Sequence, residues 1–454
     1  MKFALAQIDV IPNRPDQNIR TMVQKIREAK AQGVDLIAFP EMAVGGYLLG
    51  DKWLDDSFCQ DLMTFNDIIL QESTGIGVIY GNIYYIDPNQ SSDPSEHHPN
   101  QDGRARKYNA VYFYQNGKAV KRLMPCICLP HGVQPKLLLP NYRFFDDRRY
   151  FFSLHDVAID YGIKLEDLVQ PFVFEKEGRK VHIGLSICED LWCYDYKRNL
   201  KPLSITDLLI QNGADYIFNI SASPWTFGKN GARDRRIQYL KEESHKNFKP
   251  YFYVNCIGAQ NNGKNIVTFD GDSTIYNEDA LPVLKCTDPY TEALLVYDTT
   301  TQPPTLSYPD KGSKIEQKYQ AIIHGIRHMK NIFGSGSHPK YIIGLSGGID
   351  SALVAALLSQ AVGPNNILAA NMPSRYNSQK TRDSAKDVSK KLGIPYLEVP
   401  IDDLVQSTID TIENHDNHDP EKRLSVLNIE NIQAKIRGTS VLSNLSGKHG
   451  AIFT

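Results

Sequence analysis

Residues 341–352 read Tyr341-Ile-Ile-Gly-Leu-Ser-Gly-Gly-Ile-Asp-Ser-Ala, and this stretch is the most specific in the chain. An apolar run enters a Ser-Gly-Gly turn, and a helical pattern follows at once. Gly347 and Gly348 have no Cβ, so the backbone can approach a ligand, and free N–H groups at a helix start favour bound negative charge. No Gly-Lys-Ser/Thr follows, which excludes a Walker A loop. The stretch predicts a strand, an anion-binding turn and a helix.

The surrounding sequence repeats the strand-helix-strand pattern, which predicts a doubly wound parallel sheet. The expected elements are helix Ile315–Phe333, strand Tyr341–Leu345, helix Ser351–Ala361, strand Ile367–Met372, helix Lys380–Leu392 and strand Tyr396–Ile401.

The first two thirds of the chain also alternate short apolar runs with helical, charged stretches such as Gln17–Ala31. This alternation predicts an α/β fold, either open or layered as α/β/β/α. The expected strands are Lys2–Ile8, Val34–Phe39, Gly77–Tyr80, Ala110–Tyr114, Ile183–Ile187, Tyr216–Ile220 and Tyr251–Asn255.

Two polar stretches interrupt these patterns. Thr299–Lys314 is rich in proline, glycine and threonine, so we interpret it as a linker between domains at residues 1–298 and 315–454. Asp87–Arg106 is expected to be a surface loop. Its adjacent His97 and His98 lack further ligands at metal-binding spacing, and no metal site is expected there.

The composition is that of an ordinary globular protein of 454 residues with a formal net charge of -2 and a pI near 6.6. Neither nucleic acid nor a membrane surface is an expected partner. The N-terminus lacks the features of a signal peptide and no apolar run reaches membrane-spanning length, so a cytoplasmic protein is expected. The seven scattered cysteines are expected to be reduced thiols.

Three separate segments point to one chemistry. Cys188 ends the apolar run Ile183-Gly-Leu-Ser-Ile-Cys, Glu41 ends Ala38-Phe-Pro-Glu, and Lys136 begins Lys136-Leu-Leu-Leu-Pro-Asn-Tyr. Taken alone, each has an ordinary explanation: a buried filler thiol, a surface carboxylate and a solvated lysine. Together they resemble the nitrilase superfamily, which has a four-layer α/β/β/α fold and a Glu-Lys-Cys triad. That resemblance implies a carboxylate that takes the thiol proton, a thiolate that attacks an amide and an ammonium that stabilises the oxyanion.

Later segments narrow the resemblance to the nitrilase-type domain of glutamine-dependent NAD synthetases. They begin at Asn219, Val254 and Phe269 and read Asn-Ile-Ser-Ala-Ser-Pro, Val-Asn-Cys-Ile-Gly-Ala-Gln and Phe-Asp-Gly-Asp-Ser. The resemblance implies glutamine contacts at Tyr142, Ser223 and Lys229. Relatives commonly have arginine at the position of Lys229 and usually glutamate at that of Asp147, so the chain departs from the pattern twice. Cys126, Cys128 and Cys193 are interpreted as structural.

The Ser-Gly-Gly-Ile-Asp-Ser string resembles the phosphate loop of the N-type ATP-pyrophosphatases, which split ATP into AMP and pyrophosphate. That family implies binding of Mg²⁺ by Asp350. It implies ATP binding by Gly344, Leu345, Ser346, Gly347, Gly348, Ile349, Asp350 and Ser351.

Two further strings, Asn371-Met-Pro-Ser-Arg-Tyr-Asn-Ser and Glu430-Asn-Ile-Gln-Ala-Lys-Ile-Arg-Gly, resemble NAD synthetase sequences. They imply that Arg375 lies by the ATP and Asn431 by deamido-NAD. The ordinary alternatives are a solvated turn residue and the polar face of an amphipathic helix. Relatives continue beyond Thr454, itself an implied ATP contact, so an incomplete synthetase half is one expectation.

The implied reaction is amidation of deamido-NAD to NAD by ammonia from glutamine, with ATP and Mg²⁺ and through an adenylate. The family also implies a homo-oligomer, with an octamer as the form to test. The alternative function is that of an amidase or glutaminase with an incomplete or degenerate synthetase domain, and a second is a nucleotide-binding or assembly protein with vestigial sites. Turnover with glutamine, ATP and deamido-NAD separates the three.

Overall fold

The structure is a computed structural model that describes residues 1–86, 105–198, 201–244, 247–263, 265–301, 314–333, 340–416, 418–419 and 421–454. The chain divides into two compact units, Met1–Ala321 and Ile322–Thr454. Most of the expected loop Asp87–Arg106, including both histidines, lies outside the described residues, as does most of the expected linker.

Two mixed sheets form the centre of the first unit. The first sheet has the order β17 (Ala293–Asp298), β1 (Lys2–Gln7), β2 (Leu36–Ala38), β3 (Gly77–Ile86), β4 (Arg106–Gln115) and β5 (Lys118–Ala119), with β6 (Val133–Pro135) also paired to β4. The second sheet has the order β16 (Pro282–Lys285), β15 (Thr274–Tyr276), β12 (Tyr251–Asn255), β11 (Tyr216–Ser221), β8 (Arg179–Ile187) and β7 (Phe172–Lys176).

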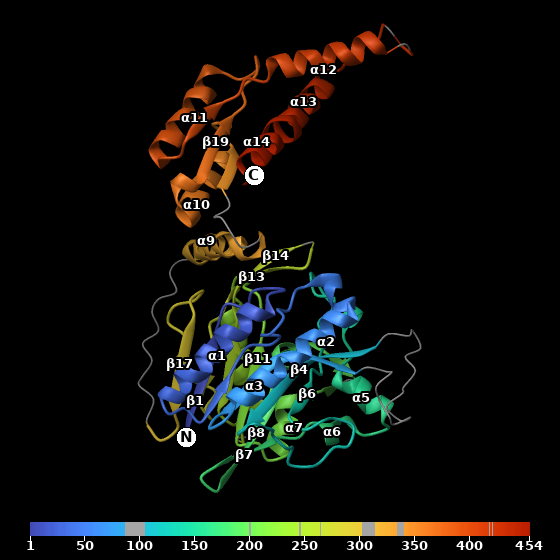
Figure 1. Cartoon of the computed structure of the whole chain (residues 1–454), viewed down its shortest axis with the longest axis vertical. Helices are drawn as coiled ribbons and strands as arrows, with labels where there is room; N and C mark the ends of the chain where they lie inside the picture. The colour runs from blue at the N-terminus through green and yellow to red at the C-terminus, as the bar shows by residue number, and fades with distance from the viewer. Residues whose placement is uncertain are drawn as a thin grey trace. The chain divides into compact units, whose positions relative to one another are not determined.

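Successive side chains of β1 show how the layers form. Phe3 and Leu5 lie in the core between the two sheets, whereas Ala4 and Ala6 face a second core beneath helices. This alternation follows from the two-residue repeat of a strand. The first sheet carries α1 and its neighbours on its outer face, and a third core lies between the second sheet and the remaining helices. The four-layer α/β/β/α fold is therefore confirmed (Figure 1).

The helices of the first unit are α1 (Pro15–Ala31), η1 (Gly50–Leu54), α2 (Asp56–Thr64), α3 (Asn66–Glu72), α4 (Asp147–Tyr150), α5 (Leu154–Asp160), α6 (Leu165–Leu168), η2 (Cys188–Asp195), α7 (Ile205–Gln211) and α8 (Lys229–Glu243). Two small hairpins pair β9 (Lys197–Arg198) with β10 (Lys201–Pro202) and β13 (Ile257–Asn261) with β14 (Ile266–Asp270).

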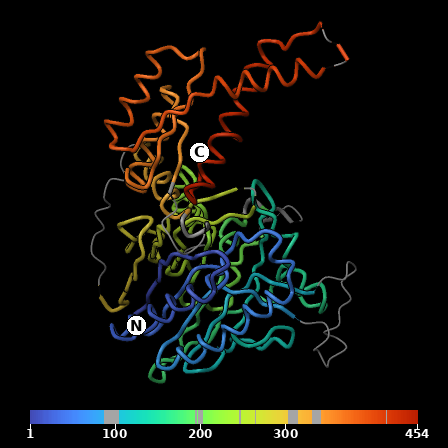
Figure 2. Tube along the Cα trace, turned by 45° about the horizontal axis from the view of Figure 1, so that its top comes forward, coloured from blue at the N-terminus to red at the C-terminus, as the bar shows by residue number. Residues whose placement is uncertain are grey.

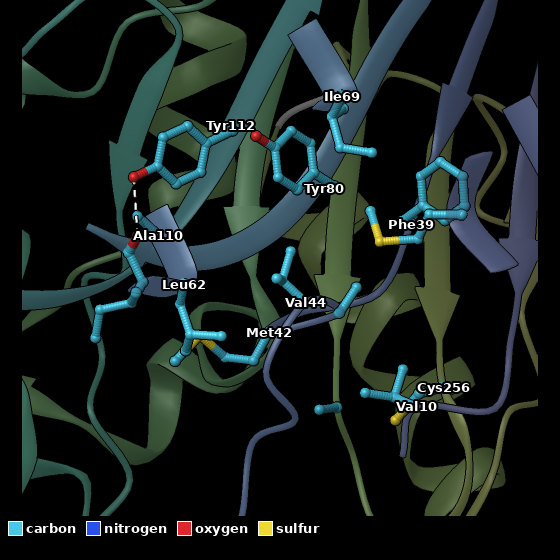
Figure 3. Close-up of a cluster of buried hydrophobic side chains, with 14 of the residues drawn as sticks. Val10, Phe39, Met42, Val44, Leu62, Ile69, Tyr80, Ala110, Tyr112 and Cys256 are labelled. Carbon is cyan, nitrogen blue, oxygen red and sulfur yellow. Dashed lines mark hydrogen bonds between the residues drawn. The ribbon is translucent and has the colours of Figure 1, made fainter. Parts of the chain in front are cut away.

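The core under α2 and α3 is aromatic as well as aliphatic. Tyr80 and Tyr112 stack with their ring centroids 5.4 Å apart, and Leu62 and Ile69 pack in the same cluster (Figure 3). The Tyr112 hydroxyl donates a hydrogen bond to the carbonyl of Ile83 at 2.8 Å. A buried hydroxyl needs such a partner, so this part of the core is both packed and satisfied.

The second unit contains one four-stranded sheet in which every neighbouring pair is parallel. The chain winds outward from β18 in one direction and then returns to β18's other side, so the switch point lies between β18 and β21. The sheet order is β20 (Tyr396–Glu398), β19 (Ile367–Asn371), β18 (Lys340–Gly344) and β21 (Ala451–Phe453).

Helices cover both faces of this sheet. One core joins the strands to α10 and α11, and another joins them to α12 and the helices that follow. The predicted doubly wound fold is confirmed, and α12 and α13 lie side by side as they project from it (Figures 1 and 2). The helices are α10 (Ile349–Val362), η3 (Pro364–Asn366), α11 (Gln379–Leu392), α12 (Asp402–His415), α13 (Val426–Lys435), the π-helix η4 (Ile436–Leu442) and α14 (Ser443–His449), while α9 (Lys314–Phe333) spans the boundary between the units.

The prediction that all seven cysteines are reduced thiols is wrong. Cys126 and Cys128 form a disulfide in the loop between β5 and β6. Their Cα atoms lie 5.5 Å apart, a separation that a disulfide can span. The other five cysteines are free and buried. The described helices include none long and apolar enough to cross a membrane.

Candidate active site

Cys188 lies at a sharp bend between a buried strand and a helical turn. Strand β8 ends at Ile187, η2 begins at Cys188, and Cys188 itself has φ +40°. Positive φ is costly for a residue with a Cβ and is concentrated at functional sites. The buried Asp190 carboxylate supports the bend by accepting from the backbone N–H groups of Ile187, Leu137 and Leu138 at 3.0, 3.2 and 2.8 Å. The thiol is thus presented from a fixed backbone.

Glu41 is fully buried and held by three donors. Its Oε1 accepts from Lys136 Nζ and from Asn109 Nδ2, both at 2.7 Å, and its Oε2 accepts from the backbone N–H of Ala222 at 2.8 Å. A buried carboxylate requires this degree of pairing. The donors come from three distant segments, so the fold fixes the orientation of Glu41.

The loop that carries Glu41 lies directly on strand β3. A Cβ atom at Gly81 would lie 2.2 Å from the backbone N of Met42 and 2.6 Å from Glu41 Cα. Contacts this short with main-chain atoms leave no room for any side chain. Gly81 therefore lets the loop approach the sheet and sets the depth of Glu41.

Lys136 lies between two carboxylates. Its Nζ lies 2.7 Å from Glu41 Oε1 and 3.4 Å from Asp147 Oδ2, and it is 3.5 Å from the Tyr47 hydroxyl. Burial alone would lower the pKa of Lys136, but the negative charges of Glu41 and Asp147 outweigh burial and hold this pKa well above its usual value. Lys136 is therefore a fixed positive charge.

Cys188 is electrostatically coupled to both residues. Burial and the negative charge of Glu41 raise the pKa of the Cys188 thiol well above its usual value, and Lys136 opposes them. The structure thus brings together Glu41, Lys136 and Cys188, as the sequence predicts. A neutral resting thiol needs a base to become a nucleophile, and Glu41 is the carboxylate whose charge acts most strongly on it.

A cavity of about 880 Å³ opens above Cys188. Tyr142, Ser223 and Lys229 all line it, so the three predicted glutamine contacts meet at the predicted nucleophile. Among the other lining residues are Glu189, Tyr196, Arg143, Arg148 and Arg235.

Glu189 belongs to the site and was missed in the sequence. Its carboxylate accepts from the Tyr196 hydroxyl at 2.6 Å and from the Tyr142 hydroxyl at 3.1 Å. Burial raises the pKa of Glu189, and these hydrogen bonds oppose the rise. In the sequence, only its position directly after Cys188 could have indicated a role. A carboxylate at that position cannot be assigned to ligand binding until the cavity is known. Glu189 places an acceptor for a cationic group in the cavity.

Lys229 is already paired. Its Nζ lies 2.7 Å from Asp270 Oδ1 and 3.0 Å from the carbonyl oxygen of Ser223, and Asn230 donates to the other Asp270 oxygen at 2.8 Å. Lys229 therefore holds the Ser223 segment in place, and Asp270 partly neutralises the charge that Lys229 could offer to a ligand. Within the described residues, no ion pair joins the cavity's Arg235 to an acidic side chain.

The predicted phosphate loop connects β18 to α10 at the switch point of the second sheet. The Ser351 hydroxyl accepts from the backbone N–H of Ser346 at 3.2 Å and donates to the carbonyl of Gly348 at 3.1 Å. Gly347 has φ +87°, and a Cβ there would lie 2.1 Å from the carbonyl oxygen of Thr381. The helix begins at Ile349, and Asp350 is exposed in its first turn. The loop presents backbone and hydroxyl groups to solvent.

The other predicted contacts differ in their distance from this loop. The carbonyl of Thr454 accepts from the backbone N–H of Gly344 at 3.0 Å, so Thr454 lies beside the loop. Arg375 is exposed, with its Nε 3.4 Å from Asp402 Oδ1. Asn431 is exposed on α13.

The family model described as carbon-nitrogen hydrolase matches residues 2–302. The chain belongs to this family. A second model, described as NAD synthase, matches residues 321–453. The resemblance to glutamine-dependent NAD synthetases is thereby confirmed in both halves.

Relatives resemble the chain over nearly its full length. The glutamine-dependent NAD(+) synthetase of Acinetobacter baylyi is 29% identical over 453 residues, which cover 99% of this chain and 71% of that protein. That of Synechocystis is also 29% identical, covering 99% and 73%. The solved glutamine-dependent NAD+ synthetase of Acinetobacter baumannii in complex with adenosine diphosphate has a TM-score of 0.75, 28% identity, and coverage of 100% and 73%.

Proposed function

We propose that this enzyme converts deamido-NAD to NAD, using ATP and ammonia released from glutamine. The observation that carries the proposal is the coupling of Cys188 to Glu41 and Lys136 below a cavity, in a chain whose other unit matches the NAD synthase family. We assign amide hydrolysis to residues 1–298 and adenylation to residues 315–454.

Glutamine hydrolysis follows from the chemistry of the three coupled groups. Glu41 takes the proton of the Cys188 thiol as the sulfur attacks the side-chain carboxamide carbon, and Lys136 stabilises the oxyanion that forms. Glu41 then returns the proton to the departing nitrogen, which leaves as ammonia. Water, deprotonated by Glu41, cleaves the glutamyl thioester, releasing glutamate and restoring the thiol.

The cavity also contains groups that complement the rest of a glutamine molecule. We assign the substrate ammonium to the Glu189 carboxylate, which the hydroxyls of Tyr142 and Tyr196 hold in place. The substrate carboxylate needs a cation that is not already neutralised. Arg235 meets that requirement better than Lys229, which is paired with Asp270.

The phosphate loop serves the second half-reaction. The nicotinate carboxylate of deamido-NAD attacks the α-phosphorus of ATP and pyrophosphate leaves; ammonia then displaces AMP to give the amide. The loop from Ser346 to Ser351 offers backbone and hydroxyl donors for the phosphates, and Arg375 and Thr454 are further proposed ATP contacts, with Asn431 proposed for deamido-NAD.

The residues near the loop fit a role for Mg²⁺. Mg²⁺ bound with nucleotides uses one or two carboxylates together with phosphate oxygens and water. Asp350 supplies an exposed carboxylate in the first turn of α10. No cluster of three or more acidic, histidine or cysteine side chains within the described residues forms a metal site by itself. Mg²⁺ would therefore be held jointly by Asp350 and ATP, and would neutralise phosphate charge.

The test measures NAD, AMP and glutamate formation from deamido-NAD, ATP and Mg²⁺, with either glutamine or ammonium as nitrogen donor. The proposal expects NAD with both donors, and glutamate only with glutamine. Glutamate without NAD from either donor would support the alternative of an amidase with a degenerate synthetase. ATP binding without any turnover would support a binding protein. Light scattering on the same sample tests the proposed homo-oligomer, and cell fractionation tests the proposed cytoplasmic location.

A further inference from the structure

Asp147 occupies an unusual position beside the triad. Its carboxylate is buried, and Lys136 Nζ lies 3.4 Å from its Oδ2, near the limit of a hydrogen bond. Lys136 lies much closer to Glu41, at 2.7 Å. A direct bond to Lys136 is therefore too long to fix the Asp147 carboxylate.

Tyr47 makes the short contacts instead. Its hydroxyl lies 2.8 Å from Asp147 Oδ1 and 2.9 Å from Oδ2, so its single proton is shared between the two oxygens. The same hydroxyl lies 3.5 Å from Lys136 Nζ, and the ammonium lies 5.0 Å from the centre of the Tyr47 ring. Tyr47 thus contacts both members of the long Lys136–Asp147 ion pair.

Tyr47 is itself held rigidly. Its backbone N–H donates to Gln260 Oε1 at 2.9 Å, and its carbonyl accepts from Trp53 Nε1 at 3.0 Å. Its ring also packs at a tilt against Phe145, with centroids 5.9 Å apart. A tyrosine whose backbone and ring are both fixed can orient a neighbouring carboxylate without moving itself.

We propose that Tyr47 is a positioning residue for amide hydrolysis, which holds Asp147 so that the Lys136 ammonium stays between two carboxylates. The inference rests on the proposed glutaminase function. If Asp147 turns away, Lys136 pairs with Glu41 alone. Lys136 then holds Glu41 in an ion pair that no second carboxylate shares, so the Glu41 carboxylate is less available to take the Cys188 proton.

The test compares Tyr47→Phe, Asp147→Glu and the double variant by glutamate formation from glutamine. We expect Tyr47→Phe to lower kcat by about 5–100-fold, the effect of losing one buried hydrogen bond to a charged group, with little change in KM. The longer glutamate side chain reaches Lys136 without help from a tyrosine hydroxyl. The double variant should therefore lie closer to Asp147→Glu alone than Tyr47→Phe lies to the parent.

A pH profile separates positioning from packing. Burial raises the pKa of Asp147 to about 6, and the Tyr47 hydroxyl opposes that rise. Removing the hydroxyl raises the pKa further, so the acid limb of kcat should move to higher pH in Tyr47→Phe. A residue that only packs would lower kcat equally at every pH.

Tyr112→Phe is the matched control, since it also removes a buried hydroxyl that donates one hydrogen bond, in this case to the carbonyl of Ile83 (Figure 3). Its pH profile should equal that of the parent. An unchanged profile and kcat in Tyr47→Phe, or a double variant no better than Tyr47→Phe, would overturn the inference. If the variants form glutamate as expected but the parent forms no NAD, only the synthetase proposal is overturned. If the parent forms no glutamate, the synthetase proposal and the Tyr47 inference are both overturned.

Discussion

The thiol site of the first unit and the phosphate loop of the second are built in opposite ways. Glu41 and Lys136 have no exposed surface and are paired with each other, whereas Ser346, Gly348 and Asp350 are exposed. A buried ion pair becomes costly when one partner is removed, so the first site depends on side chains fixed before substrate arrives. The second offers backbone donors whose charged partners arrive with the ligand. Substitutions should therefore act on chemistry in one unit and on ligand binding in the other.

Cys188→Ala should have the largest effect. Glutamate formation should fall at least ~10⁴-fold, because loss of a covalent nucleophile removes the reaction path itself. NAD formation with ammonium should persist, since the second unit does not use the thiol. Cys193→Ala, which removes another buried free thiol outside the cavity lining, is the control and should retain glutamate formation. Loss of both reactions in Cys188→Ala alone would contradict the division of labour.

Glu41→Gln should lower glutamate formation by about 10²–10⁴-fold, the usual range for a general base. The amide keeps the volume of the carboxylate but cannot take the thiol proton. Rates of glutamate release at saturating glutamine measure the effect. The exposed carboxylate in Glu175→Gln serves as the control. A rate within a few-fold of the parent would mean that another group deprotonates Cys188.

Gly347→Ala should act only on the second unit. The new Cβ meets the Thr381 carbonyl oxygen and the backbone has φ +87°, so strain of ~1–3 kcal/mol must be relieved by moving the loop. NAD formation with ammonium should fall about 5–100-fold while glutamate formation continues. Gly447→Ala, where the added Cβ meets nothing within 4 Å, should leave both reactions intact. Equal losses of both activities would show that the sites are not separable in this way.

Glutamate formation should also fall as pH drops through about 6. Burial raises the pKa of Asp147 to about 6, and Asp147 must be ionised to share the Lys136 ammonium with Glu41. The folded-state pKa lies above the ordinary value, so the charge is present above pH 6 and lost below it. Asp147→Asn should start from a lower rate and lack this limb. An unchanged limb in that variant would assign it to another group.

Arg375→Ala should have the smallest effect on stability. Its ion pair with Asp402 is half exposed, so the free energy of unfolding should change by less than ~1 kcal/mol. The KM for ATP should nevertheless rise if Arg375 reaches the nucleotide as proposed. Thermal unfolding and NAD formation with ammonium give the two measurements. A KM equal to that of the parent would leave Arg375 as a surface turn residue.

The alternation of apolar runs with helical stretches was sufficient for an α/β fold, and the resemblance to the nitrilase superfamily supplied its four layers. Phe3 and Leu5 face one core and Ala4 and Ala6 another, but all four residues are apolar, so the sequence alone does not separate the two cores. The loop at Gly347 was also readable, since glycine in a strand-to-helix turn has a local physical meaning. Such features depend on near neighbours in the chain.

Features built from distant segments could not be read in this way. Tyr47 and Asp147 are 100 residues apart, and Glu41 receives a hydrogen bond from Ala222, 181 residues away. No local pattern distinguishes Tyr47 or the Ala222 amide from other tyrosines or backbone amides, and Asp147 stood out only through the family resemblance. The same reason explains Lys229, whose pairing with Asp270 became apparent only in the fold.

The contact of Gly81 with the Glu41 loop has a consequence for how this protein can vary. Gly81 touches no substrate in the proposed mechanism, yet any side chain there must displace the base. In a survey of random substitutions, position 81 should therefore tolerate replacement as poorly as position 188. Selection would then hold a residue without a side chain as firmly as it holds the nucleophile.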